Sequence, residues 1–550
     1  MGAAAAMGAK QMSTAFDARL GPSAVKPVKP HLDHPLDIRL ALTLLAVLAG
    51  GLFYMAYSIR SDLSETGGGP TTILPFLLLG VALLIALGFE FVNGFHDTAN
   101  AVATVIYTHA LPAQAAVVWS GCCNLLGVLA SSGAVAFGIV SLLPVELILQ
   151  VGSSAGYAMV FALLIAAIIW NLGTWWMGLP ASSSHTLIGS IVGVGVANAL
   201  MRGQDGTSGV DWDQVTKIGE ALLFSPIFGF FLSAALLLAM KAVIKAPELY
   251  KAPTTNAPPA PWVRGLLVLT CTLVSFFHGS NDGQKGMGLI MLILIGVAPT
   301  ASALNRAPPP GHADAFIAAA HNGSKVIEAH GNGYNVIGDP RPAVTDYIHA
   351  HKISEGTYPS LAVLVKQISD SVEQYGSVAK TPLDKVQNVR NDMYLASEAI
   401  RVLAKDKESE LSADEKKQLS EFKKQLDYST KFIPLWVKIC VAIALGLGTM
   451  VGWKRIVVTV GEKIGKTHLT YGQGAAAEII AAATIGAADG LGLPVSTTHV
   501  LSSGVAGTMV ANGSGMQWST VRNLALAWVL TLPAAMLLSG ILFLIFRQIF

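Results

Sequence analysis

Two stretches of the chain carry the same set of polar residues inside apolar sequence: GLPASSSHTLIG (178–189) and GLPVSTTHVLSS (492–503). Between 178–198 and 492–512, ten of twenty-one positions are identical. Proline is favoured in the first turn of a helix and serine at its N-cap, so each stretch predicts a helix that begins at membrane depth. The first turn offers free N–H groups and the positive end of the helix dipole, with three hydroxyls beside them. That combination suits a tetrahedral oxyanion, although hydroxyls in membrane helices often bond only the preceding turn or pack helices closely.

A second, weaker pair of stretches twice places an aspartate in apolar sequence. FVNGFHDTANAVAT (91–104) resembles FFHGSNDGQKGMGL (276–289), and Asp97 matches Asp282. A carboxylate at the centre of a bilayer is costly, so we expect both to face a cavity and to hold a cation or a proton.

Two further carboxylates lie in apolar sequence. Glu90 precedes Asp97 by seven residues, or two helical turns, and Glu478 precedes Pro494 by sixteen. Either could carry a coupling proton, because burial favours the neutral form of a carboxyl group. The alternative is that each lies at an interface or packs between helices.

Hydropathy indicates which elements position these residues. The chain has 550 residues, of which 52% are hydrophobic and only 13% are charged. Many uncharged apolar runs approach or exceed the roughly 18 residues that mark a membrane helix, for example 40–57, 72–89 and 525–546. Only helices satisfy their own backbone groups in lipid, so we predict an all-α polytopic membrane protein with about 10 to 12 transmembrane segments. Polar-interrupted segments that recur in two halves are typical of a transporter, which predicts repeats with broken or re-entrant helices.

The apolar pattern divides the chain into four parts. Residues 303–431 are charged and amphipathic, and SADE (412–415) resembles a capping box, so we predict a soluble helical insertion there. Scattered histidines in it could bind metal, but simple exposure is the plainer interpretation. The other predicted parts are a disordered N-terminal tail (1–37), a membrane domain with the first repeat and the start of the second (38–302), and the remainder of the second repeat (432–550).

The positions of basic residues predict the topology. Residues 240–264 and 453–466 are basic connections, and the positive-inside rule places both in the cytoplasm. If 264–297 forms one broken crossing, the insertion lies on the other side of the membrane. Two crossings would reverse its side.

The four polar motifs closely resemble those of bacterial members of the inorganic phosphate transporter family. The resemblance covers nearly all of the chain beyond its first apolar run. It implies a multi-pass bundle of inverted repeats in the cytoplasmic (inner) membrane that imports phosphate. It also implies proton symport of a neutral complex between phosphate and a divalent metal, with sodium-coupled phosphate symport as the alternative.

The resemblance implies roles for individual residues. The residues expected to contact phosphate are Ser183, Ser184, Thr497 and Thr498. The residues expected to cap the two helices are Ser182 and Ser496. The residues expected to hold the coupling cation or a proton are Asp97, Asn100, Asn281 and Asp282. His185 and His499 could donate to phosphate, or each could be a packing residue satisfied by one partner.

Lys285 departs from the family pattern. The family signature has an asparagine three residues after the aspartate, and the first copy keeps Asn100, whereas the second copy has Lys285. An ammonium group offers sodium no oxygen ligand. Our hypothesis is that Lys285 acts as a tethered cation beside Asp282 and that protons replace mobile sodium. The alternative is that Lys285 extends to the membrane interface.

Two other functions compete with phosphate transport. A membrane-embedded hydrolase would need serine, histidine and aspartate in contact, but Ser184 and His185 are adjacent in sequence and do not face each other on a helix. Transport of sulfate or of a metal ion would differ only in substrate. We therefore predict a transporter with no cofactor, no nucleic acid partner and no firmly assigned resident metal. Its expected partners are inorganic phosphate, H+ or Na+, a divalent metal such as Mg2+ or Ca2+ and the lipid bilayer, and a homodimer is left open.

Overall fold

The computed structural model describes residues 29–32, 38–65, 73–97, 99–143, 148, 153–331, 333–406 and 408–550. This part of the chain is helical and contains no strand. The predicted N-terminal tail (1–37) lies outside the described residues except for 29–32. The helices, with η1–η3 as 3-10 turns and η4 as a π turn, are α2 (Ile38–Glu65), α3 (Ile73–Asp97), α4 (Ala99–Tyr107), α5 (Ala113–Ala130), α6 (Ala134–Val140), α8 (Ser154–Trp176), α9 (Ser183–Met201), η1 (Gly206–Gly209), α10 (Trp212–Val243), η2 (Pro247–Tyr250), α11 (Pro261–Val297), α12 (Pro299–Ser302), α13 (His312–Ala329), α14 (Arg341–Ala350), α15 (Thr357–Tyr375), η3 (Val378–Lys380), α16 (Val386–Lys405), α17 (Ala413–Thr430), α18 (Leu435–Thr449), α19 (Lys454–Val458), η4 (Thr459–Lys463), α20 (Tyr471–Gly490), α21 (Thr497–Asn512) and α22 (Trp518–Phe546).

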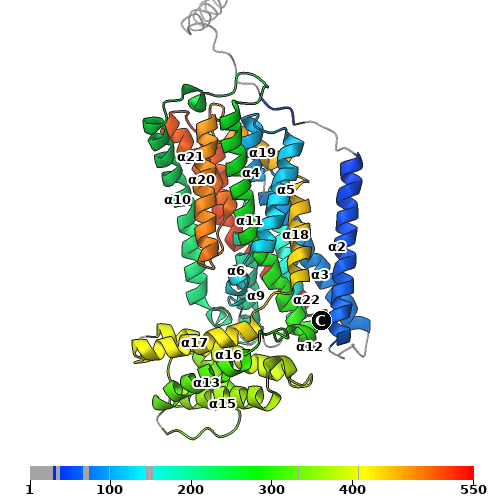
Figure 1. Cartoon of the computed structure of the whole chain (residues 1–550), viewed down its shortest axis with the longest axis vertical. Helices are drawn as coiled ribbons and strands as arrows, with labels where there is room; N and C mark the ends of the chain where they lie inside the picture. The colour runs from blue at the N-terminus through cyan, green and yellow to red at the C-terminus, as the bar shows by residue number, and fades with distance from the viewer. Residues whose placement is uncertain are drawn as a thin grey trace, which may run out of the picture.

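The long helices run side by side as one bundle, and a smaller layer of helices, α13–α17, crosses one end of it (Figure 1). Among the described residues, eight helical spans are long and apolar enough to cross a membrane, and α17 and α18, which meet at 73°, would be a ninth if they count together as one bent span. Helices α20 and α21 run in the same bundle (Figure 1) but are too short or too polar to meet that criterion. The described bundle thus contains the candidate spans and these two further helices, and the predicted number of 10 to 12 transmembrane segments stays a prediction.

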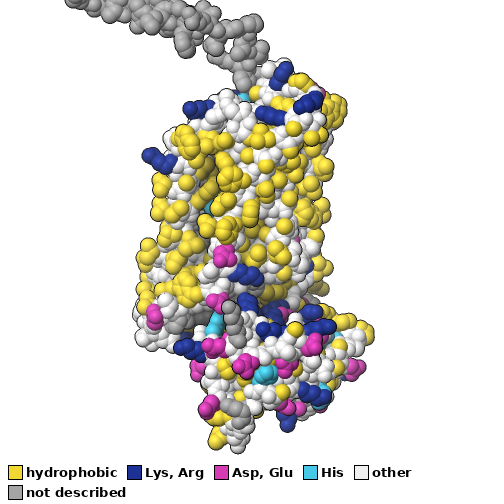
Figure 2. Space-filling model, turned by 90° about the vertical axis from the view of Figure 1, so that its left-hand side faces the viewer, with side chains coloured by type: hydrophobic (Ala, Val, Ile, Leu, Met, Phe, Trp, Pro, Cys, Tyr) yellow, Lys and Arg dark blue, Asp and Glu magenta, His cyan; other side chains and the backbone are white. Residues whose placement is uncertain are grey.

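The surface of the bundle is apolar along its length. Figure 2 shows hydrophobic side chains over the bundle, whereas charged side chains gather mostly on the insertion and at the opposite end. Large side chains such as Phe231, Val529 and Leu537 are 65–71% exposed there. Such a band would be unfavourable in water, so it is the surface that faces lipid, and the chain is a multi-pass membrane protein.

Helix α11 settles one choice that the sequence left open. It is a single continuous helix of 37 residues, so the predicted single crossing is present, but the predicted break in it is wrong. Its glycines serve packing instead. An ideal Cβ at Gly279 would lie 2.1 Å from the carbonyl oxygen of Asn124, and one at Gly288 would lie 2.6 Å from that of Ala136. Small residues at these positions let α5 and α6 approach closely without bending α11.

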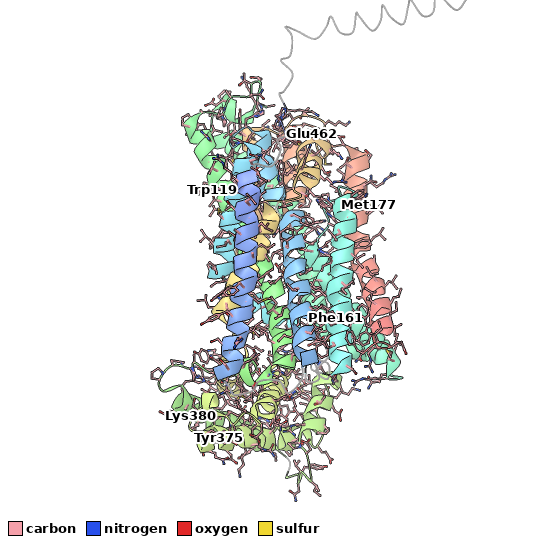
Figure 3. The ribbon with its side chains drawn as sticks, turned by 90° about the vertical axis from the view of Figure 1, so that its right-hand side faces the viewer. Trp119, Phe161, Met177, Tyr375, Lys380 and Glu462 are labelled. Atoms are coloured by element: carbon pink, nitrogen blue, oxygen red, sulfur yellow. The ribbon has the colours of Figure 1, made fainter. Side chains whose placement is uncertain are left out.

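The single crossing separates the insertion from the basic connections. Glu462, in the 453–466 stretch, lies at one end of the molecule, and Tyr375 and Lys380 of the insertion lie at the other (Figure 3). The insertion itself is stabilised locally. The predicted capping box is confirmed, because Ser412 and Glu415 exchange side-chain to main-chain hydrogen bonds at the start of α17.

Helices of each half of the bundle pack against helices of the other half. Helix α9 packs on α8 and α22, and α21 packs on α20 and α10. In the same way α3 packs on α18, and α11 packs on α5. The pairings of one half therefore have counterparts in the other, as two repeats would require. The inverted orientation of the repeats stays a prediction.

Candidate functional site

Helix α9 begins inside the bundle, at Ser183. The side chain of Ser182 accepts a hydrogen bond of 3.2 Å from the main-chain N–H of His185, so the predicted N-cap is confirmed. Pro180 lies before the helix rather than in its first turn, because Ala181 and the cap separate it from Ser183. The missing N–H of proline thus falls in the connecting segment, and it removes no N–H group from the first turn of α9.

Helix α21 repeats this arrangement. It begins at Thr497, and the side chain of Ser496 accepts a hydrogen bond of 3.2 Å from the main-chain N–H of His499. Pro494 again precedes the helix. The two capped helix starts are the elements that the repeated motif predicts.

Asp97, the last residue of α3, joins the two helix starts. Its Oδ2 accepts a hydrogen bond from Ser183 Oγ at 2.5 Å, and its Oδ1 accepts one from Thr498 Oγ1 at 2.7 Å. His96 Nδ1 lies 3.2 Å from Oδ1, and the other ring nitrogen contacts Thr174. All of these side chains are buried. One carboxylate therefore holds hydroxyls from both halves of the protein.

Asp282, on α11, is the second carboxylate of the cluster. Lys285 Nζ lies 2.7 Å from Asp282 Oδ2 and donates to Ser184 Oγ at 2.5 Å. Ser183 Oγ lies 3.4 Å from the same Oδ2. Lys285 is fully buried, so it does not extend to the membrane interface.

Asn281 and Ser184 bind the segment that leads into α21. Asn281 Nδ2 donates to the carbonyl of Leu493 at 3.0 Å, and its Oδ1 lies 3.4 Å from the N–H of Val495. Ser184 Oγ donates to the carbonyl of Val495 at 2.8 Å. The amide of Asn281, predicted to hold a cation, is thus engaged with the main chain of the loop.

His278 completes the cluster, and the sequence analysis did not assign it a role. Its Nε2 lies 3.6 Å from Asp282 Oδ2, and its Nδ1 lies 2.9 Å from Asn124 Oδ1. One ligand atom from each of Asp97, His278 and Asp282 lies within 4.8 Å of the other two, which is close enough to hold a small cation. The spacing of His278 and Asp282, four residues apart on one helix, was the signal available in the sequence.

The two motif histidines contact each other. The ring centroids of His185 and His499 are 4.6 Å apart, and Trp528 stacks on His499 at 4.2 Å. Nδ1 of His185, Nε2 of His499 and the Thr497 hydroxyl are buried and have no hydrogen-bond partner among the described residues. Polar atoms without partners in a buried site are the ones open to a ligand.

Glu90 and Glu478 lie outside this cluster. Asn93 Nδ2 donates to Glu90 at 3.4 Å, and the Glu90 side chain lies against Gly286, next to Lys285. Glu478 accepts hydrogen bonds from the hydroxyls of two threonines of other helices, Thr104 and Thr270. The side chain of Asn100 lies outside the described part of the chain.

The charges of the cluster decide what it can bind. The cluster buries the carboxyl groups of Asp97 and Asp282 together with the side-chain amine of Lys285. Each helix start contributes roughly half a positive charge from its dipole. The arrangement can hold an anion at the hydroxyls only if cations or protons join it.

Comparison with known proteins gives matches that cover most of the chain. The family model described as "Phosphate transporter family" matches residues 93–539. The low-affinity inorganic phosphate transporter PitA of Escherichia coli K12 is 43% identical over 482 residues, which covers 84% of this chain and 95% of PitA. PitB of the same organism is 41% identical over 493 residues, which covers 86% of this chain and 97% of PitB.

A solved structure titled "The sodium-dependent phosphate transporter" aligns with 86% of this chain and 100% of its own, at 20% identity and a TM-score of 0.48. The relatives are named as transporters, which is not an enzyme class, and the hydrolase alternative is dropped on that ground. The match of the family model over most of the chain and the identity to PitA lead to one conclusion: the chain belongs to the phosphate transporter family.

Proposed function

We propose that the chain imports inorganic phosphate by proton symport, with the phosphate bound between the starts of α9 and α21 as a neutral complex with a divalent metal. The single observation that carries the proposal is the position of Asp97, whose carboxylate binds Ser183 of one helix start and Thr498 of the other. The carboxylate expected to bind a cation or a proton is thus hydrogen-bonded to hydroxyls that are expected to donate to the anion.

The shared hydrogen bonds link the anion to the proton. Ser183 and Thr498 each have one hydroxyl hydrogen, and each donates it to Asp97. A phosphate oxygen can accept hydrogen bonds from these two hydroxyls only when Asp97 no longer accepts them. Protonation of the Asp97 carboxyl group makes it a weaker acceptor. The proton and the anion therefore favour each other's binding, which is what symport requires.

Charge balance supports a metal in the transported complex. A phosphate dianion would add two negative charges to a buried cluster that already contains the carboxyl groups of Asp97 and Asp282. A divalent cation on the phosphate cancels the added charge before it enters low-dielectric surroundings. In this proposal the metal travels with phosphate as substrate.

Lys285 favours protons over sodium. Its ammonium binds Asp282 Oδ2, one of the oxygens that sodium would need, and brings no oxygen of its own. Sodium-coupled symport remains the competing proposal, because Asp97, His278 and the free oxygen of Asp282 could hold a small cation.

The test is uptake of labelled phosphate into proteoliposomes in which proton and sodium gradients are imposed separately. We expect uptake in sodium-free buffer with an inward proton gradient, and an increase when Mg2+ or Ca2+ is added outside. Strict dependence on sodium would overturn the proton proposal. Competition by unlabelled sulfate as strong as that by unlabelled phosphate would overturn the assigned substrate.

A further inference from the structure

Asp489 is a carboxylate in the last turn of α20, and neither the motifs nor the cluster around Asp97 accounts for it. Helix α20 ends partway along the bundle (Figure 1), so Asp489 lies inside the protein's length rather than at its end. Its Oδ2 accepts a hydrogen bond from Ser280 Oγ at 2.6 Å, and its Oδ1 accepts one from Gln284 Nε2 at 2.6 Å. Both donors lie on α11.

Gln284 extends this contact to a third element. Its Nε2 also donates to the carbonyl of Ser280 at 2.8 Å, which fixes the amide plane. Its Oε1 accepts a hydrogen bond of 2.9 Å from the main-chain N–H of Val135, in the first turn of α6. The amide is fully buried and fully used, so one side chain connects α6, α11 and the end of α20.

These contacts surround the residues of the site. Ser280 and Gln284 flank Asn281 and Asp282 on α11. In sequence, Asp489 is directly followed by the segment 490–496. The side chain of Asn281 forms hydrogen bonds with main-chain groups of this segment. The hydrogen bonds of Asp489 therefore hold the end of α20 against α11. The separation of these two elements sets the distance between Lys285 and the start of α21.

The described position of the first half that corresponds to Asp489 has no carboxylate. By the offset that relates the two motifs, the residue that corresponds to Asp489 is Trp175, whose Nε1 donates to the carbonyl of Gly452 at 2.7 Å. The carboxylate is thus not a requirement of the repeat. Asp489 is half-buried, and its partners place it beside one copy of the site.

We propose that Asp489 is a positioning residue for phosphate transport. Through Ser280 and Gln284 it fixes the α20–α21 segment against α11, so that substrate meets a site whose loop is already ordered. This inference rests on the proposed location of the phosphate site. Without Asp489 the substrate must order the segment itself, and that cost falls on binding more than on the maximal rate.

The experiment compares three variants with wild type in proteoliposomes, with uptake rate measured against phosphate concentration. Loss of a hydrogen bond to a charged group is typically worth about tenfold in an equilibrium constant. We expect Asp489→Ala to raise the KM for phosphate about tenfold with a smaller change in maximal rate. Asp489→Asn keeps an acceptor oxygen and should recover part of the loss. Gln284→Ala should resemble Asp489→Ala, and the double variant should be no worse than either.

Ser539→Ala is the matched control, because among the described residues that buried hydroxyl donates to a carbonyl of its own helix, that of Met536. An unchanged KM in Asp489→Ala, or strictly additive effects of the two alanine changes, would overturn the inference. If Asp489→Ala does not yield monodisperse protein, Asp489→Asn and Gln284→Ala decide by the same criteria. Ser183→Ala measured in parallel keeps the two proposals apart: normal uptake in that variant counts against the assigned phosphate site, not against the contact between α20 and α11.

Discussion

Lys285 and Asp282 show what single residues contribute to the site. The sequence revealed that a lysine replaces the second asparagine, and local helix geometry places it one turn from Asp282. The second partner, Ser184 on α9, could not be predicted, because 101 positions separate the two residues and only the fold of the bundle brings them together. The same holds for Asp97, whose hydroxyl partners come from two distant helices.

Replacement of Lys285 by glutamine should strongly reduce proton-driven uptake. The change leaves the buried carboxylate of Asp282 without its ammonium, and removal of one partner of a buried pair typically costs about 3–5 kcal/mol. We expect uptake to fall at least tenfold in proteoliposomes with a proton gradient.

Lys438→Gln is the control for this change. Lys438 also lies in a membrane helix, but its Nζ donates to a main-chain carbonyl, that of Ser131, and not to a carboxylate. Retention of full proton-driven uptake by Lys285→Gln would show that the tethered cation has no role.

At the scale of elements, glycines determine how closely α9 and α21 pack against their neighbouring helices. Gly193 of α9 and Gly507 of α21 are equivalent positions of the repeated motif. An ideal Cβ would lie 2.1 Å from the carbonyl oxygen of Met536 at the first position and of Phe230 at the second. The helix starts were predictable from local capping chemistry, but these contacts with α22 and α10 were not, since they join segments far apart in the chain.

Gly193→Ala and Gly507→Ala should each destabilise the protein. The added methyl group meets backbone that cannot move aside, and overpacking of this kind typically costs about 1–3 kcal/mol. We expect a lower melting temperature in detergent for both variants. Gly173→Ala on α8, where the added Cβ meets nothing within 4 Å, should melt like wild type. Wild-type melting of all three would contradict the packing described here.

The arrangement of the whole molecule follows from charge and hydropathy, which is why most of it could be predicted. The bundle, the helical insertion and their separation by a single crossing of α11 needed only long apolar runs and the positions of basic residues. The contacts between the insertion and the bundle could be identified only in the structure. For example, Arg401 of α16 binds Asp211, the N-cap residue of α10, at 2.7 Å.

The insertion is predicted to lie outside the cytoplasm. In a variant with Cys122→Ser, which removes the exposed native thiol, a cysteine at Lys424 should react with a membrane-impermeant maleimide in intact cells. A cysteine at Lys251, in the basic connection at the other end, should react only after the cells are permeabilised. The reverse pattern would invert the assigned topology.

Acid should weaken the insertion. Burial acts to raise the pKa of Glu398, but Lys431 and Arg401 outweigh it and hold the pKa below its usual value. A group with a lowered folded pKa stabilises the fold above its unfolded pKa, about 4.3, and that contribution is lost as the pH falls through the folded value. We expect proteolysis of the insertion in the full-length protein to accelerate below about pH 4.

Two variants check this acid sensitivity. Glu398→Gln should be more sensitive to protease already at pH 7 and should change less in acid. The exposed Glu373→Gln should behave like wild type at both pH values. An identical acid response of Glu398→Gln and wild type would exclude this ion-pair network as the cause.

The central claim is that the hydroxyls at the two buried helix starts, joined through Asp97, form the phosphate site. The most direct measurement is labelled phosphate uptake by the quadruple alanine variant of Ser183, Ser184, Thr497 and Thr498, reconstituted as monodisperse protein beside wild type. We predict uptake at the level of empty liposomes, because four donors are lost while the capping serines keep both helices in place. Uptake with wild-type KM and maximal rate would contradict the account.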